Sequence, residues 1–357
     1  MSPIQLTRSP QSASVGHRDA RAPRRWLWPA VLGRNYLRRT FLSSWLYQLR
    51  AQWRNLNAVP LKSKIAALFE MSRDIRIRHH SATSAPTVGL GIADDEKLTV
   101  ILLNHQRPQN IGQVARYILR AGFVNRLVIS NNNQAYPIDR YVGIEDSRLV
   151  LIDHDEPTGP GISFELARQY RSRYYLRVDD DIFLHPAQLQ WLYWCLRQSP
   201  NAPHGIFGAA FSPGKDPAKD WPFDHRRYCN SPVDILNGLF AFTWDHLSEY
   251  SRLCELLGIV DRKRFMNGED IVMSFAGNRK PMIHNIGRIW ECSSEAAAGV
   301  ALHRTRPRFY EERWKIFSAL ERIKPLSNGK GASVSRFQQM PALVLRFDSE
   351  EETFLGG

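Results

Sequence analysis

Three consecutive aspartates, residues 179–181, follow directly on Tyr174–Val178, a short segment that is apolar except for Arg177. Adjacent carboxylates raise one another's pKa values unless a cation compensates their charge. Asp179 and Asp181 are two residues apart and project to the same side of an extended chain. Mg²⁺ and Mn²⁺ take oxygen ligands, commonly one or two carboxylates together with substrate phosphates. The triplet therefore predicts a metal–pyrophosphate site; the alternative is a solvated acidic turn before a helix that begins near Pro186.

A second acidic pair, Glu269 and Asp270, precedes the helical run Ile271–Ala276. Acidic side chains are favourable in the first turn of a helix, so this pair could simply stabilise the helix start. A carboxylate at a helix start is also well fixed in space, which suits a catalytic group. The residues alone leave both interpretations open.

Alternating strand and helix patterns must position these carboxylates. Leu98–Leu103 is a short continuous apolar run, typical of a strand buried on both faces, and Pro108 begins a helical segment after it. A helix is also expected over 164–173, and further strands over 127–130, 149–152, 174–178, 205–211 and 235–243. This alternation predicts an α/β sheet that is largely parallel at its start.

Polar residues fall where the predicted strands end. Asn104 ends the first strand, Asn131 and Asn132 end the second, and the aspartate triplet ends the fourth. Ligands of such sheets bind at the carboxyl ends of the strands. Asparagine amides can pair with the donor–acceptor edge of a pyrimidine, although asparagines are also common in turns.

The positive charge is concentrated at the N-terminus. The chain of 357 residues has a formal net charge of +13, and residues 1–90 hold 15 Lys and Arg against 3 Asp and Glu. Residues 91–357 are therefore nearly neutral, which excludes a nucleic-acid-binding surface by composition, and no nucleic-acid partner is expected. The four cysteines form no CxxC pair, which favours free thiols in a reducing compartment.

Residues 24–55 interleave tryptophans and leucines with arginines. Such a basic amphipathic segment can lie on an anionic membrane surface; a helical pair packed on the main domain and a transit peptide are the alternatives. The sequence has no run of 18 apolar residues and no clean apolar core of a signal peptide. We therefore expect a cytoplasmic protein, peripheral on the membrane at most, with organelle targeting left open.

The composition changes divide the chain into three parts. We expect a basic extension over 1–90, partly disordered and partly helical, an α/β domain over 97–325, and a tail over 326–357.

Five short blocks give residues 97–325 a resemblance to GT-A glycosyltransferases, especially the exostosin-like group, family 64. In order along the chain they are Asn104–Arg107, Asn131–Asn132, Tyr175–Asp181, Gly268–Phe275 and Gly299–Arg304. The resemblance implies a GT-A-type Rossmann-like mixed sheet flanked by helices. It also implies a metal-dependent hexosyltransferase that moves a sugar, with retention, from a nucleotide-diphospho-sugar such as a UDP-sugar to a glycan or lipid-linked acceptor.

The resemblance also implies roles for individual residues. Asp181 with Asp179 would hold Mn²⁺ or Mg²⁺, Asp270 would face the sugar and acceptor, and Arg304 would add positive charge beside the diphosphate. The residues expected to contact the nucleotide are Asn104, Arg107, Asn131, Asn132, Asp179 and Asp180. Further candidate site residues are Glu269, His303 and Arg168.

Two other functions compete with sugar transfer. A nucleotidyltransferase would share the strand-end carboxylates and the metal, but it normally carries a glycine-rich loop after the first strand, and residues 104–110 contain no glycine. A non-catalytic protein could instead bind a membrane or a polyanion through residues 1–80.

Overall fold

The computed structural model describes residues 92–105, 107–212, 221–292, 303, 306 and 308–325. The predicted basic extension with its segment 24–55, the tail over 326–357, and Arg304 lie outside the described residues. No helix in the described ranges is long and apolar enough to cross a membrane.

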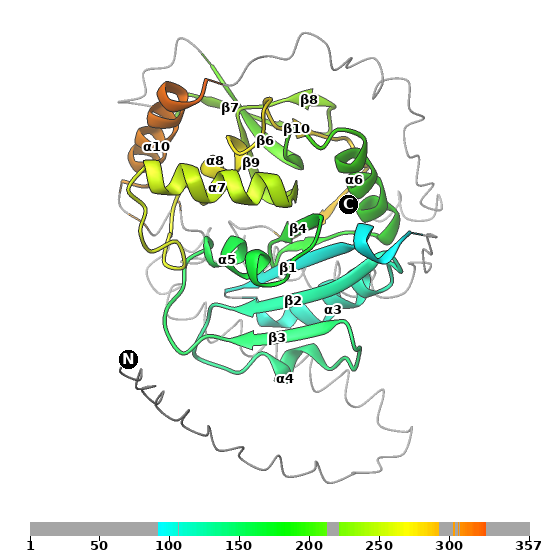
Figure 1. Ribbon diagram of the computed structural model, residues 1–357. Coiled ribbons are helices and arrows are strands. Elements are labelled where there is room, and N and C mark those ends of the chain that lie inside the picture. The colour runs from blue at the N-terminus through cyan, green and yellow to red at the C-terminus, as the bar shows by residue number, and fades with distance from the viewer. Residues whose placement is uncertain are drawn as a thin grey trace, which may run out of the picture. The chain divides into compact units, whose positions relative to one another are not determined.

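One mixed sheet organises the described part of the chain (Figure 1). Its order is β3-β2-β1-β4-β9-β6-β10-β8, with β7 paired to β6, and β5 and β11 form a separate two-stranded sheet. The strands are β1 (Leu98–Asn104), β2 (Val124–Asn131), β3 (Leu149–Asp153), β4 (Tyr174–Val178), β5 (Ile182–Phe183), β6 (His204–Phe211), β7 (Phe223–Arg227), β8 (Ser231–Pro232), β9 (Ile235–Thr243), β10 (Met282–Ile283) and β11 (Trp290–Glu291).

The first half of the sheet is parallel and the second half is mixed. β1 lies between β2 and β4 and is parallel to both, and β2 is parallel to β3. β9 runs antiparallel to β4 and to β6. The parallel strands therefore bring the carboxyl ends of β1, β2 and β4 to one edge, as the sequence predicts.

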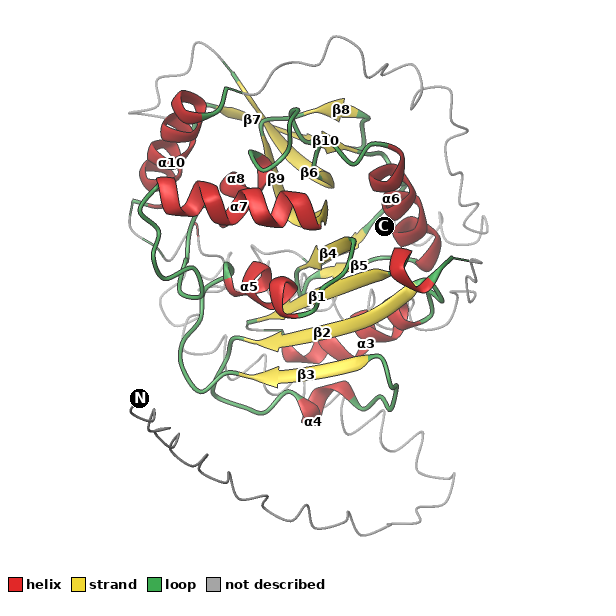
Figure 2. Ribbon diagram, viewed as in Figure 1, coloured by secondary structure: helices red, strands yellow, loops and turns green. Residues whose placement is uncertain are grey.

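Helices cover both faces of the sheet (Figure 2). They are α3 (Pro108–Leu119), α4 (Asp139–Val142), α5 (Ile162–Gln169), α6 (Pro186–Gln198), α7 (Trp244–Leu256), α8 (Glu269–Ser274) and α10 (Phe309–Ile323), with a 3₁₀ turn over Asp94–Glu96. In β1, Val100 and Leu102 pack into the core beneath α3 and α6, whereas Ile101 packs into the core beneath α5 and α7. The expected α/β mixed sheet flanked by helices is confirmed.

Local sequence explains where the elements begin and end. Pro108 occupies the first turn of α3, and Thr243 with His246 forms a capping box that begins α7 directly after β9. β4 and β9 have the predicted bounds, and β2 begins earlier than predicted, at Val124. The helix predicted over 164–173 ends at Gln169, because the backbone of Tyr170 leaves the helical region at φ −108° and ψ 77°.

Candidate functional site

Two adjoining hollows meet at the carboxyl end of β4. The larger, of about 330 Å³, lies between the strand ends and the helices α8 and α10. The smaller, of about 220 Å³, is lined from β5, β6, β7 and β9. Asp179, Asp181 and Gly238 line both hollows. The predicted metal-binding pair therefore stands where the two spaces join.

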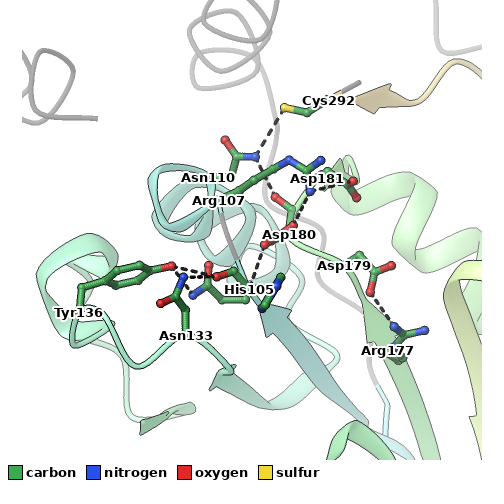
Figure 3. Close-up of polar contacts among 11 residues, drawn as sticks. His105, Arg107, Asn110, Asn133, Tyr136, Arg177, Asp179, Asp180, Asp181 and Cys292 are labelled. Carbon is green, nitrogen blue, oxygen red and sulfur yellow. Dashed lines mark hydrogen bonds and ion pairs between the residues drawn. The ribbon is translucent and has the colours of Figure 1, made fainter. Parts of the chain in front are cut away.

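The middle aspartate of the triplet has a different role from its neighbours. Asp180 is 6% exposed, and its two carboxylate oxygens accept from the backbone N–H of His105 at 3.0 Å and from Nη1 of Arg107 at 3.0 Å (Figure 3). Its carbonyl oxygen accepts from Nδ2 of Asn110 at 2.8 Å. These bonds tie the end of β4 to the connection between β1 and α3, so Asp180 is held by the protein itself.

Each outer aspartate faces an arginine. Nη1 of Arg107 lies 3.2 Å from Oδ2 of Asp181, and Nη2 of Arg177 lies 2.9 Å from Oδ1 of Asp179. Burial raises the pKa of Asp179; the charge of Arg177 opposes the rise, and that of Asp181 adds to it. The Asp179 side chain is 32% exposed. Burial is therefore only part of the cause, and the neighbouring carboxylates also raise the pKa of Asp179.

The second acidic pair begins α8 and lines the larger hollow. Nη1 and Nη2 of Arg313, on α10, contact the two carboxylate oxygens of Asp270 at 2.8 and 2.6 Å. The guanidinium of Arg313 also lies 5.3 Å from the ring centre of Phe309 and 5.6 Å from that of Trp221. Asp270 thus lies at a helix start and is fixed beside a cavity, and its catalytic role stays a prediction.

Arg177 connects the two acidic pairs. It is 4% exposed, and its Nη2 lies 3.7 Å from a carboxylate oxygen of Glu269 as well as close to Asp179. Burial and the neighbouring charge of Asp270 raise the pKa of Glu269. One buried cation therefore compensates carboxylates from β4 and from α8.

Asn104 and Asn131 lie in a buried amide network. Nδ2 of Asn104 donates to Oδ1 of Asn131 at 2.6 Å, and Nδ2 of Asn131 donates to Oδ1 of Asp153 at 2.6 Å and to the carbonyl of Tyr136 at 2.8 Å. Neither side chain lines a hollow. Asn132 and Arg107 do line the larger hollow, and the nucleotide contacts predicted for Asn104 and Asn131 stay predictions.

Of the two remaining candidates, His303 lies beside the larger hollow and Arg168 lies away from it. His303 lines the larger hollow, with its ring centre 6.4 Å from that of Phe309. Arg168 lies in the last turn of α5 and donates to Oγ of Ser251, on α7, at 2.5 Å. Because α5 leads into the start of β4 and the triplet follows its end, Arg168 is not brought to the site.

Two arginines of the site, Arg177 and Arg313, escaped the sequence-based reasoning. Arg177 is a charge inside an otherwise apolar strand, a pattern that requires a buried partner. Arg313 precedes Phe317 by four residues and Leu320 by seven, which places it on the buried face of its helix. Both patterns are visible in the sequence, but neither shows which carboxylate pairs with the arginine.

The donor atoms at the triplet fit a shared cation site. Among the described residues, no group of three or more His, Cys, Asp and Glu could hold a metal by itself. Two carboxylates, Asp179 and Asp181, face the joined hollows. This set suits Mg²⁺ or Mn²⁺ whose other ligands are phosphate oxygens and water, rather than an all-protein site.

Gly238 keeps the junction between the hollows open. Its φ is +68°, and a Cβ there would lie 3.3 Å from Cδ1 of Ile182 and 3.6 Å from Oδ2 of Asp179. We expect Gly238→Ala to cost about 1 kcal/mol of stability because of the positive φ. It should lower any turnover at the site roughly tenfold, because the added Cβ displaces Ile182 and the backbone at the junction. Gly258→Ala is the matched control, because Gly258 has φ +72° and no atom within 4 Å of an added Cβ. Urea unfolding would first show that both variants are folded. Equal turnover of the two folded variants would then contradict the expectation.

Comparisons with known proteins give fold similarity only. No family model and no curated protein matches the chain. A CMP:2-keto-3-deoxy-manno-octonic acid synthetase complexed with CTP aligns at a TM-score of 0.32 and 13% identity, over 44% of this chain and 78% of that one. GalNAc-T7 with UDP, GalNAc and Mn²⁺ aligns at a TM-score of 0.41 and 10% identity, over 55% of this chain and 43% of that one. The chain thus spans less than half of the GalNAc-T7 chain, and the resemblance to family 64 stays a prediction.

Proposed function

We propose that this protein is a metal-dependent glycosyltransferase that moves a sugar from a nucleotide-diphospho-sugar, a UDP-sugar, to a glycan or lipid-linked acceptor. The observation that supports this most is the position of Asp179 and Asp181 at the junction of two hollows. A transfer between two substrates needs two adjoining spaces and a charged group where they meet. Glu269 and Asp270 lie on the wall of the larger space.

The donor's diphosphate would lie against the triplet. Asp179 and Asp181 would hold Mn²⁺ or Mg²⁺, which when bound acts as a Lewis acid on the departing diphosphate. Arg107 lines the same hollow and offers a guanidinium whose paired N–H groups suit phosphate oxygens. Arg304, outside the described residues, is proposed for the same task by the family resemblance. Asn132, which lines the larger hollow, is proposed to contact the nucleotide.

The two acidic residues of α8 suit different tasks. Both oxygens of Asp270 already accept from Arg313, so this side chain suits a fixed negative charge beside a cationic sugar transition state. The pKa of Glu269 is raised by burial and by Asp270, which makes Glu269 the better proton acceptor for an acceptor hydroxyl. Retention of configuration follows from the family resemblance alone.

The proposal is tested by titrating UDP into the protein calorimetrically, with Mn²⁺ and with excess chelator. We expect binding only with Mn²⁺, and its loss in Asp181→Asn. Asp146→Asn is the matched control, since Asp146 forms an ion pair with Arg148 away from both hollows. Equal UDP binding in chelator, or in Asp181→Asn, would contradict the metal site.

A donor screen then separates the transferase classes. Release of UDP from a UDP-sugar in the presence of Mn²⁺ would support sugar transfer. Release of pyrophosphate from a nucleoside triphosphate and a free sugar would identify a nucleotidyltransferase instead. The described connection from β1 to α3 has no glycine-rich loop, which disfavours that alternative.

A further inference from the structure

The guanidinium of Arg107 contacts Asp181, one of the two proposed metal ligands. Its Nη1 lies 3.0 Å from Oδ1 of Asp180 and 3.2 Å from Oδ2 of Asp181 (Figure 3). One nitrogen therefore bridges two consecutive carboxylates. A divalent ion on Asp181 and the guanidinium of Arg107 would repel each other at such short range, so the two cations compete for this carboxylate.

The other end of the Arg107 guanidinium is not satisfied. Arg107 is 8% exposed, and its Nη2 is buried without a hydrogen-bond partner in the described part of the chain. Arg107 also lines the larger hollow. A buried donor without a partner is costly, and a phosphate oxygen in that hollow would satisfy it.

The side chains that line the larger hollow carry an excess of negative charge that a divalent cation could balance. Its described lining holds five carboxylates, namely Asp179, Asp180, Asp181, Glu269 and Asp270, and three guanidinium groups, Arg107, Arg177 and Arg313. With all of these groups ionised, the carboxylates exceed the guanidiniums by two charges. One divalent ion would neutralise this excess.

We propose that Arg107 and the divalent cation exchange at Asp181. In the metal-free protein Arg107 bridges Asp180 and Asp181. When the cation binds Asp181, Arg107 keeps its bond to Asp180 and turns its free nitrogen to the diphosphate. Asp180 can act as the fixed pivot, because its other carboxylate oxygen and its carbonyl are held by His105 and Asn110. This exchange rests on the proposed metal site and makes Arg107 a positioning residue that couples metal binding to diphosphate binding.

The test measures metal and nucleotide affinity separately in Arg107→Gln. Mn²⁺ binding without nucleotide, followed by the loss of the free-ion signal in electron paramagnetic resonance, should tighten by roughly tenfold because a competing charge-assisted hydrogen bond is removed. Calorimetric UDP binding at saturating Mn²⁺ should weaken by roughly tenfold or more. Opposite changes in the two affinities are the signature of exchange, since a merely structural loss would weaken both.

Arg262→Gln is the matched control, because Arg262 also pairs with a partly buried carboxylate, Glu165, and lines neither hollow. It should leave both affinities unchanged. Arg107→Lys keeps the competing charge without the second nitrogen, so it should retain the wild-type Mn²⁺ affinity and lose UDP affinity. If Arg107→Gln does not fold, the loss of UDP affinity in Arg107→Lys at unchanged Mn²⁺ affinity tests the proposal instead.

The outcomes separate the inference from the proposed function. Unchanged or weaker Mn²⁺ binding in folded Arg107→Gln, with normal Mn²⁺-dependent UDP binding by the wild type, would overturn the exchange and leave the proposed function standing. Absence of Mn²⁺-dependent UDP binding by the wild type would overturn both. A crystal structure with Mn²⁺ and UDP should show Nη1 of Arg107 more than 4 Å from Oδ2 of Asp181, and a retained bridge would contradict the exchange.

Discussion

Replacement of Arg313 by methionine should abolish the proposed sugar transfer and lower the free energy of unfolding by about 3–5 kcal/mol. The reason is the bidentate pair that Arg313 forms with Asp270, whose side chains are 8% and 11% exposed. Without the guanidinium, Asp270 would be a buried charge with no cation to compensate it. Methionine keeps an apolar stem against Trp221 and Phe309, so the change isolates the lost charge.

The double variant separates stability from catalysis. Asp270→Asn added to Arg313→Met removes the uncompensated charge, and most of the lost stability should return. Transfer should not return, because the proposed charge beside the sugar is then absent. Urea unfolding followed by circular dichroism gives the stability, and UDP release from the UDP-sugar gives the turnover.

Lys315→Met is the control on the same helix. Lys315 is exposed and pairs with Glu311, so its loss should change the unfolding free energy by less than about 1 kcal/mol. If Arg313→Met unfolded at the wild-type urea concentration, the ion pair would not stabilise the fold. If the double variant regained turnover, Asp270 would not act on the sugar.

The fold could be predicted from the sequence because its central strands carry strong local signals. β4 and β9 have the bounds expected from their apolar runs, and the aspartate triplet lies at the end of β4 as predicted. The short strands β5 and β11 were not predicted, since two residues carry no periodicity and their pairing joins segments over 100 residues apart in the chain.

The site could be predicted only in part, because the direction of a side chain depends on distant neighbours. Asn131 and Asn132 are adjacent and chemically identical in sequence, yet Asn131 is buried against Asp153 whereas Asn132 lines the larger hollow. The partner of Asp270 is 43 residues away, on α10. Local patterns place the carboxylates at strand and helix ends, but only the packed structure shows which cation compensates each one.

A stacked pair of histidines lies in the core far from the chemistry of the hollows. The rings of His204 and His284 are centred 4.9 Å apart, and Nδ1 of His204 lies 2.7 Å from Nε2 of His284. Nε2 of His204 donates to the carbonyl of Ser199 at 2.7 Å, so at most one of the two facing ring nitrogens, Nδ1 of His204 and Nε2 of His284, can carry a proton between the rings. Burial lowers the pKa of His204 to about 4, and burial together with the charge of His204 lowers that of His284 well below its usual value.

This pair should make the protein acid-sensitive. Between pH 6.5 and about 4, histidines of the unfolded chain bind protons, whereas His204 and His284 in the folded protein do not. The free energy of unfolding therefore falls as the pH falls. The loss from His204 alone is about 3 kcal/mol, complete near pH 4 and absent above pH 7. Urea unfolding at pH 7.5, 6 and 5 should show this decline. His204→Gln should make it shallower by the share of His204, while His284 and the buried His246, whose pKa values burial also lowers, keep the rest. His225→Gln, at an exposed histidine, should keep the wild-type slope. A decline of equal slope in His204→Gln would show that the buried pair does not cause the acid sensitivity, because stability would then be lost through other groups.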